Sequence, residues 1–161
     1  MRTILFVCSG NTCRSPMAEA IARHWTSKGL LGDEDVFIAS AGAYADEGSP
    51  PSRETLRALE RWKIHLDGAS KTLNRQMIEN ADLVLVMGAM HVQAARELVR
   101  GDADQIAKID QLDPEHEIDD PIGQGQAAYD ALAERFMELI PRRLKELLAD
   151  ENCTGSGSSR G

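Results

Sequence analysis

The sequence has few of the features that mark membrane, secreted or disulfide-rich proteins. No apolar run approaches the roughly 20 residues of a membrane-spanning helix, and the N-terminus enters a short apolar run, residues 4–7, without the pattern of a signal peptide. Only three cysteines are present, Cys8, Cys13 and Cys153, which are too few for a disulfide framework and are not spaced as zinc-binding pairs. We therefore expect a cytoplasmic protein with at least one functional thiol.

Positive charge is also in short supply. The chain has 18 lysines and arginines against 26 aspartates and glutamates, a net charge of -8. Such a surface repels the nucleic-acid backbone and anionic lipid heads, so we expect no general binding to nucleic acids or membranes. The segment 102–120 is the most acidic; a solvated face is the common meaning of such a run, although it would also attract a cationic substrate.

The order of apolar runs predicts an α/β protein. A length of 161 residues suits one domain. Apolar runs that predict strands cover residues 4–7, 36–41, 83–87 and, more weakly, 106–109. Helical periodicity follows Pro16 and Ser52 and covers residues 73–80, 90–100 and 126–149. We predict a single doubly wound four-stranded parallel sheet flanked by helices on both faces, formed by residues 1–151, and a disordered tail over residues 152–161.

The loop after the first predicted strand carries the residues best suited to chemistry. It reads Cys8-Ser9-Gly10-Asn11-Thr12-Cys13-Arg14-Ser15-Pro16. Ligands bind beyond the carboxyl ends of the strands in such sheets, and this spacing allows backbone N–H groups and a helix N-terminus to surround a tetrahedral anion. Gly10 permits the backbone conformation that this requires. We predict a phosphate-binding loop formed by Ser9, Gly10, Asn11, Thr12, Cys13, Arg14 and Ser15.

Within this loop, Cys8 is the candidate nucleophile. The Arg14 guanidinium can bind two phosphate oxygens at once. The converging positive field favours the reactive thiolate of Cys8, to which Ser15 can donate a hydrogen bond. A buried structural cysteine before an ordinary helix is the alternative. The joint match of strand, Gly10, Arg14-Ser15 and Pro16 favours the chemical role.

At these residues the sequence resembles the low-molecular-weight protein tyrosine phosphatase family, whose signature CxGNxCRSP is matched from Cys8 to Pro16. The resemblance continues at residues 40–42, 81–87 and Asp120-Pro121. It implies phosphorylated proteins as substrates, a cysteinyl-phosphate intermediate and inorganic phosphate as product, with no metal and no other cofactor. It also implies that Asp120 acts first as general acid and then as general base.

The resemblance further implies how the loop is supported. Asn11 and Ser40 correspond to positions that hold the loop in shape through hydrogen bonds. Reversible oxidation to a disulfide between Cys8 and Cys13 is a further expectation, since one tight loop holds both sulfurs. The family often has a histidine where this chain has Ser70, so we expect that part of the hydrogen-bond network to differ.

The acid has support that is independent of the resemblance. A leaving group departs at low cost only when it is protonated, and like charges at Asp119, Glu117 and Glu115 favour the protonated form of a carboxyl group. An Asp-Pro pair by itself indicates a turn. Together with the Cys8 loop, the pair favours Asp120 over Asp119 as the acid.

Two residues favour phosphoarginine as the substrate. The form CxGNTCRSPMAE, matched from Cys8 to Glu19, is similar to the bacterial protein arginine phosphatases, and a Thr12 hydroxyl suits a guanidinium better than a phenyl ring. Tyrosine phosphatases of the family usually follow Asp-Pro with aromatic residues, where this chain has Ile122. Tyr44 could still form one wall of the cleft, so phosphotyrosine is the alternative.

Two more distant readings are an arsenate reductase and a non-catalytic phosphate-binding module. Arsenate reduction relays a disulfide through further cysteines, and the sequence has only Cys153 beyond the loop. A binding module would not need both Cys8 and Asp120. The four histidines share no metal-ligand spacing, so we predict surface or capping roles for them and no metal site.

Overall fold

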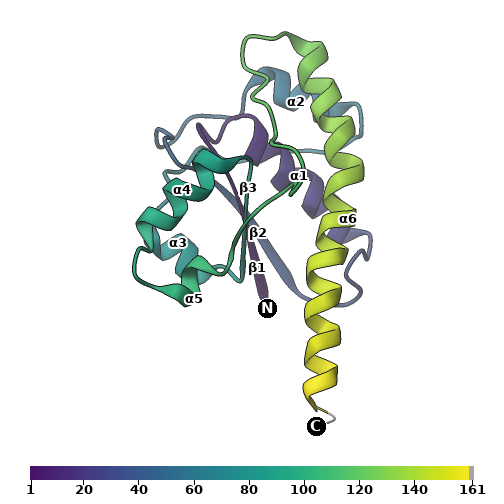
Figure 1. Ribbon diagram of the computed structural model, residues 1–161. Helices are drawn as coiled ribbons and strands as arrows, with labels where there is room; N and C mark the ends of the chain where they lie inside the picture. Colours follow the sequence, from purple (N-terminus) through teal and green to yellow (C-terminus); the bar gives the residue numbers. More distant parts are fainter. Residues whose placement is uncertain (160–161) are drawn as a thin grey trace.

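The structure is a computed structural model that describes the backbone of residues 1–159 and the side chains of residues 1–148. Its centre is a parallel sheet of four strands in the order β2-β1-β3-β4 (Figure 1). The strands are β1 (Arg2–Cys8), β2 (Val36–Gly42), β3 (Leu83–Val86) and β4 (Ile109–Gln111). This arrangement confirms the predicted four-stranded parallel sheet.

Helices cover both faces of the sheet, as a doubly wound fold requires (Figure 1). One face packs against α1 (Arg14–Ser27), α2 (Arg53–Glu60) and α6 (Gln126–Ser159). The other packs against α3 (Arg75–Asn80), α4 (Ala89–Leu98) and α5 (Ala103–Ile106). Two of these helices start where a side chain caps the first turn: Ser52 accepts a hydrogen bond from Thr55 N, and Asn74 accepts one from Met77 N.

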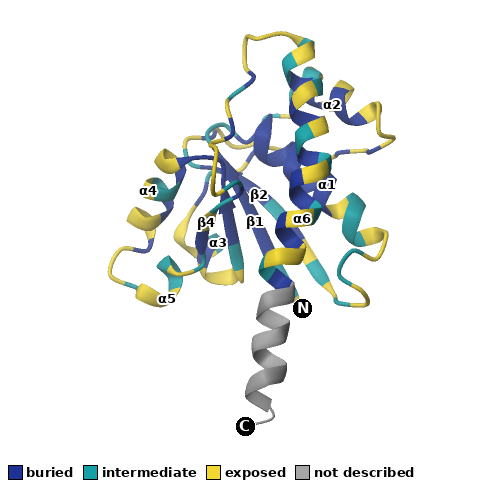
Figure 2. Ribbon diagram, turned by 45° about the vertical axis from the view of Figure 1, so that its right-hand side comes forward, coloured by how far each residue is buried: buried dark blue, intermediate teal, exposed yellow. Residues whose placement is uncertain are grey.

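The alternation of side chains along β1 places the nucleophile candidate. Ile4, Phe6 and Cys8 pack in the core under α1 and α6, whereas Leu5 and Val7 pack in the core under α3 and α4. All these side chains are buried, as the dark central strands of Figure 2 show. Cys8 is thus the last residue of a strand that is buried from Ile4 onwards, at the carboxyl edge of the sheet where α1 begins.

Most elements differ from the prediction by one or two residues at an end, and two differ by more. The fourth strand starts at Ile109 rather than at residue 106, because the Asp102 side chain accepts a hydrogen bond from Gln105 N and caps a short helix that includes Ile106. The assignment of α6 continues to Ser159, past the predicted end at residue 149. The predicted tail, residues 152–161, and Cys153 within it lie outside the fully described residues, so that division of the chain stays a prediction.

One long side chain from α6 covers the free edge of the sheet. Arg143 is buried and donates hydrogen bonds to the carbonyl oxygens of Gln111 and Leu112 and to Asp110 Oδ2. Asp110 Oδ1 accepts the Gln111 N–H in turn. The polar backbone atoms of Gln111 at this edge strand are therefore already bonded within the molecule. In the part of the chain that the structure describes, no helix is long and apolar enough to cross a membrane.

Candidate active site

The Cys8 side chain lies at the centre of a tight loop between β1 and α1. It is buried, with its Sγ atom 2.9 Å from Ser15 Oγ and accepting a hydrogen bond from the backbone N–H of Asn11 at 3.3 Å. Both contacts come from residues beyond it in the loop, so the loop closes around the sulfur. These contacts fix the position of the sulfur within the loop.

The loop depends on Asn11 for its shape. Asn11 has a φ of 56°, in the left-handed region, whereas Gly10 is not among the glycines at positive φ. The prediction that Gly10 supplies the special conformation is therefore wrong. Asparagine tolerates this region when its side chain is hydrogen-bonded locally. Here Asn11 Oδ1 accepts the Lys71 N–H at 2.9 Å, and Nδ2 donates to Ser15 Oγ at 2.8 Å and to Ser40 Oγ at 3.0 Å.

The end of β2 supports the loop from the other side. Ser9 O accepts the Tyr44 N–H at 2.9 Å, and Cys8 O accepts the Ala43 N–H at 2.8 Å. A Cβ atom at Gly42 would lie 2.5 Å from Ser9 O and 3.0 Å from Asn11 N. Only glycine permits this close approach of the two backbones.

Arg14 links the loop to Asp120, the predicted acid, which is more than 100 residues away in the sequence. Its side chain is buried, and Nη1 donates to Ile118 O at 2.7 Å. Nη2 donates to Ser9 Oγ at 3.4 Å and lies 3.6 Å from Asp120 Oδ2. A single guanidinium thus faces both the phosphate loop and the candidate acid, which is the geometry needed to bind a phosphoryl group between them.

The segment that carries Asp120 is held in place by its neighbours on the chain. Ile118 N donates to Met87 O, and Glu117 Oε1 accepts the N–H of Ala89 at the start of α4. Asp120 Oδ1 accepts the Ile122 N–H, and the side chain is 41% exposed, so it can reach both substrate and water. The charged group within ion-pair distance of Asp120 is Arg14, a cation. We expected acidic neighbours to surround the Asp120 carboxyl group. One of them, Glu117, instead binds the start of α4.

Thr12 and Cys13 face α2 and α6 rather than the Cys8 sulfur. Thr12 O accepts the Ser52 N–H at 2.9 Å, which ties the loop to the start of α2. Cys13 Sγ lies 3.5 Å from both Ser52 Oγ and Tyr129 OH. Burial, followed by the contact with Cys13, raises the pKa of Tyr129. Cys8 and Cys13 are free thiols, and their reversible disulfide stays a prediction.

The Thr12 side chain lines a hollow of about 650 Å³ beside the loop. Ile122 lines the same hollow, and its side chain is 60% exposed. Tyr44 is 64% exposed in the loop after β2. Tyr129 and the charged residues Glu54 and Arg57 line the same hollow, which lies next to the loop but is not lined by Cys8.

The profile of the low molecular weight phosphotyrosine protein phosphatase family matches residues 3–153. The chain belongs to this family. It is a phosphoprotein phosphatase, and therefore a hydrolase, which sets aside the arsenate reductase and the non-catalytic module.

Relatives in the family include enzymes named for two substrates. The protein-arginine-phosphatase of Bacillus subtilis is 32% identical over 149 residues, which cover 91% of this chain and 97% of the relative. The low molecular weight protein-tyrosine-phosphatase PtpB of Staphylococcus epidermidis is 30% identical over 139 residues, 86% of this chain and 94% of that protein.

Solved structures of the family share the fold. The YwlE arginine phosphatase from Geobacillus stearothermophilus superposes with a TM-score of 0.80 at 33% identity, covering 96% of this chain and 97% of that one. A YwlE arginine phosphatase mutant with a phosphorylated active site serine gives a TM-score of 0.80 at 31% identity, covering 91% of this chain and 95% of that one.

One buried residue beside the phosphate loop was not predicted from the sequence. His91, for which we expected a surface or capping role, is 1% exposed, and its Nε2 atom lies 2.8 Å from Ser9 Oγ. Its Nδ1 atom is buried without a partner among the described residues. His91 lies in the first turn of α4, shortly after β3, the strand beside β1, and this place in the chain is the signal that could have found it.

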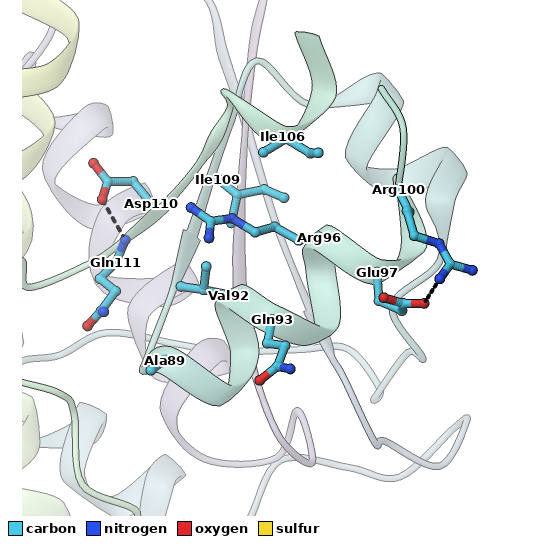
Figure 3. Close-up of a pocket in the computed structure, with 10 residues that line it drawn as sticks. All are labelled: Ala89, Val92, Gln93, Arg96, Glu97, Arg100, Ile106, Ile109, Asp110 and Gln111. Atoms are coloured by element: carbon cyan, nitrogen blue, oxygen red, sulfur yellow. Dashed lines mark hydrogen bonds and ion pairs between the residues drawn. The ribbon is translucent and has the colours of Figure 1, made fainter. Parts of the chain in front are cut away.

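Two other features stand apart from the phosphatase site. Ser70 bonds to Asp46 O and Ser49 N, so it holds the 46–49 loop and makes no hydrogen bond to Asn11. Figure 3 shows a groove of about 710 Å³ between α4, α5 and β4, and no residue of the Cys8 loop lines it. Among the described side chains, no group of three or more histidines, cysteines and acids is placed to hold a metal ion.

The burial of His91 predicts a pH-dependent stability. Burial, followed by the charge of Arg14, lowers the pKa of His91 from 6.5 to about 4, although Glu117 and Asp120 act in the opposite direction. Between these pH values the unfolded chain holds a proton here that the folded chain does not, so falling pH favours unfolding. We expect this residue to remove about 3 kcal/mol from the free energy of unfolding as the pH falls from 6.5 through 4.

Urea unfolding at a series of pH values measures this effect. His91→Gln keeps a polar atom near Ser9 but cannot titrate, so its stability should change less than that of the parent protein over this range. His65→Gln is the control, because the His65 side chain is 84% exposed. If the His91→Gln and parent curves run parallel, the ring of His91 does not carry the effect.

Proposed function

We propose that this phosphatase hydrolyses phosphoarginine in proteins through a cysteinyl-phosphate intermediate, with Cys8 as nucleophile, Arg14 as phosphate ligand and Asp120 as general acid and base. The observation that carries the proposal is the position of Arg14. One guanidinium contacts Ser9 in the phosphate loop and Asp120, so the nucleophile and the acid flank one phosphoryl position. Backbone N–H groups of the loop complete a cradle for its oxygens.

In the first step the Cys8 thiolate attacks phosphorus in line with the leaving group. The S–P bond forms and the bond from phosphorus to the arginine nitrogen breaks. Asp120 gives its proton to that nitrogen, so arginine leaves as a stable cation in the guanidinium form. Arg14 and the loop N–H groups stabilise the charge on the phosphoryl oxygens.

In the second step water attacks the phosphorus of the intermediate. Asp120, now ionised, accepts a proton from that water, the S–P bond breaks and inorganic phosphate leaves. Cys8 returns as a thiolate, and the hydrogen bond from Ser15 stabilises this leaving group. A thiolate of this kind requires a reducing environment, which fits the predicted cytoplasmic location.

The choice of phosphoarginine has two sources of support. We take the hollow lined by Thr12 and Ile122 as the mouth of the site. No aromatic residue directly follows Asp120-Pro121, and Tyr129, which also lines the hollow, is only 4% exposed. Proteins named arginine phosphatases are among the relatives over nearly the full chain. Phosphotyrosine is the second candidate, since other relatives are named tyrosine phosphatases and Tyr44 is exposed next to the loop.

The first test concerns the nucleophile. Cys8→Ser should lose turnover by several orders of magnitude, because no residue is placed to activate a serine hydroxyl there. Binding of vanadate or phosphate should persist, since Arg14 and the loop N–H groups remain. Release of phosphate from a phosphoarginine peptide measures the loss, and calorimetry measures the binding. Substantial turnover by a variant that still binds phosphate would exclude Cys8 as the nucleophile.

The second test concerns the acid. Asp120→Asn should slow turnover by roughly 10² to 10⁴ for poor leaving groups and much less for p-nitrophenol, which departs without a proton. The measurement is kcat for phosphoarginine or an alkyl phosphate compared with kcat for p-nitrophenyl phosphate. Asp119→Asn is the matched control and should change neither. Equal losses on both substrates in Asp120→Asn would place the acid elsewhere.

The third test concerns the substrate. Thr12→Ile removes a hydroxyl and adds apolar bulk at the mouth, which should penalise phosphoarginine and favour an aromatic phosphate. The ratio of kcat/KM for matched phosphoarginine and phosphotyrosine peptides should therefore fall, whereas Thr12→Ser should preserve it. A parallel loss on both peptides would mean that Thr12 only supports the loop, and phosphotyrosine would become the better candidate.

A further inference from the structure

A continuous chain of hydrogen bonds links Cys8 to a buried carboxylate that the mechanism above does not use. Ser15 Oγ lies 2.9 Å from Cys8 Sγ and 2.8 Å from Asn11 Nδ2. Asn11 Nδ2 also donates to Ser40 Oγ at 3.0 Å, and Ser40 Oγ donates to Glu19 Oε1 at 2.8 Å. All five residues are buried, with Glu19 only 6% exposed.

The direction of each hydrogen bond in this chain is fixed from its ends. The Lys71 N–H can only donate, so the atom of Asn11 that faces it is the amide oxygen, and Nδ2 faces both serines. Each serine oxygen therefore accepts from Asn11, and its proton must point elsewhere. The Ser40 proton goes to Glu19. The Ser15 proton has two acceptors, Cys8 Sγ at 2.9 Å and Ala41 O at 3.3 Å.

Glu19 forms an ion pair with a residue on the same helix. Its Oε2 atom lies 2.9 Å from Nη1 of Arg23, one turn further along α1, and Arg23 also donates to Ile38 O at 2.8 Å. A polar cavity of about 130 Å³ borders the pair, with Asp67 and Lys71 on its wall. An ionised carboxylate can only accept hydrogen bonds, so it holds the Ser40 proton and keeps the Ser40 oxygen available to Asn11.

We propose that Glu19 is a positioning residue for the Cys8 thiolate: by accepting the Ser40 proton it keeps the Ser40 oxygen as an acceptor for Asn11, and Asn11 in turn holds Ser15 beside the sulfur. The inference rests on the proposed function only in taking Cys8 as the nucleophile. It assigns to α1 a second role besides presenting its N-terminus to the phosphate. Glu19 touches neither substrate nor sulfur and acts only through the three intervening side chains.

Two accounts of Glu19 predict opposite effects when its charge is removed. If Glu19 acted only as a nearby negative charge, Glu19→Gln would make ionisation of Cys8 easier. If it positions the chain, the variant loosens Ser40 and Asn11, Ser15 is held less firmly beside the sulfur, and ionisation becomes harder. The charged or titratable groups around the loop are Arg14, Asp120 and, through Ser9, His91, and the substitution leaves all three in place.

Alkylation of Cys8 by iodoacetamide over a range of pH separates these accounts, because only the thiolate reacts. Tandem mass spectrometry distinguishes Cys8 from Cys13 in the products. For Glu19→Gln we expect the midpoint of the rate-against-pH curve to rise by about one pH unit, which corresponds to about a tenfold loss of thiolate stabilisation. We also expect kcat to fall about tenfold with KM changed less than about twofold, since the loop still binds phosphate.

Ser40→Ala tests the same chain with every charge intact. It should raise the midpoint in the same direction, and the double variant should show less than the sum of the two shifts, because both changes interrupt one path. It also decides the question if Glu19→Gln does not fold. The control is Glu79→Gln, which breaks a similarly spaced but exposed ion pair with Arg75 on α3 and should change nothing.

Three results would overturn the proposal: a midpoint in Glu19→Gln that stays or falls, an unchanged midpoint in Ser40→Ala, or fully additive shifts. Alkylation needs no phosphorylated substrate, so the two proposals fail separately. A raised midpoint in a protein that does not hydrolyse phosphoarginine would refute the substrate and leave the positioning role intact.

Discussion

The whole site depends on one side-chain amide, that of Asn11. Its hydrogen bonds hold a left-handed backbone at the centre of the loop, and they join α1, β2 and the segment before α3. Other hydrogen bonds join these parts in pairs, such as Ser40 to Glu19 and Gly42 N to Lys71 O, but the Asn11 amide contacts all three. The amide therefore converts a well-packed core into a site with defined distances around Cys8. A buried network of this kind stabilises one arrangement only while every member is bonded.

Much of this architecture follows from the sequence because it depends on local patterns. Buried parallel strands read as short apolar runs: residues 4–7 and 36–41 lie in strands, and the run 83–87 extends one residue past the end of β3. The inward stripe of α6, with Phe136 and Ile140 fully buried, follows from helical periodicity. The Cys8 loop could be located because chain order alone places it at the carboxyl edge of the sheet.

The parts that could not be predicted depend on contacts between distant residues. Nothing in the residues around His91 indicates that Ser9, 82 positions away, lies against its ring. The contact between Arg14 and Asp120 likewise exists only after β3 and the following loop are in place, so the neighbours of Asp120 in the sequence were a poor guide to its electrostatic surroundings. Gly10 and Asn11 are adjacent and both tolerate unusual backbone angles. Only the distant partners of the Asn11 amide decide which of the two adopts them.

The arginine that covers β4 has a consequence for how molecules of this protein meet one another. An uncovered edge strand is a template on which a strand from a neighbouring molecule can assemble, and that is the first step of many aggregation pathways. Here Arg143 and Asp110 occupy the donor and acceptor of Gln111 that such a strand would need. An incoming strand would have to displace a buried guanidinium before it could form a hydrogen bond with Gln111. The sheet therefore ends at its fourth strand, and crowding of these molecules does not extend it at this edge.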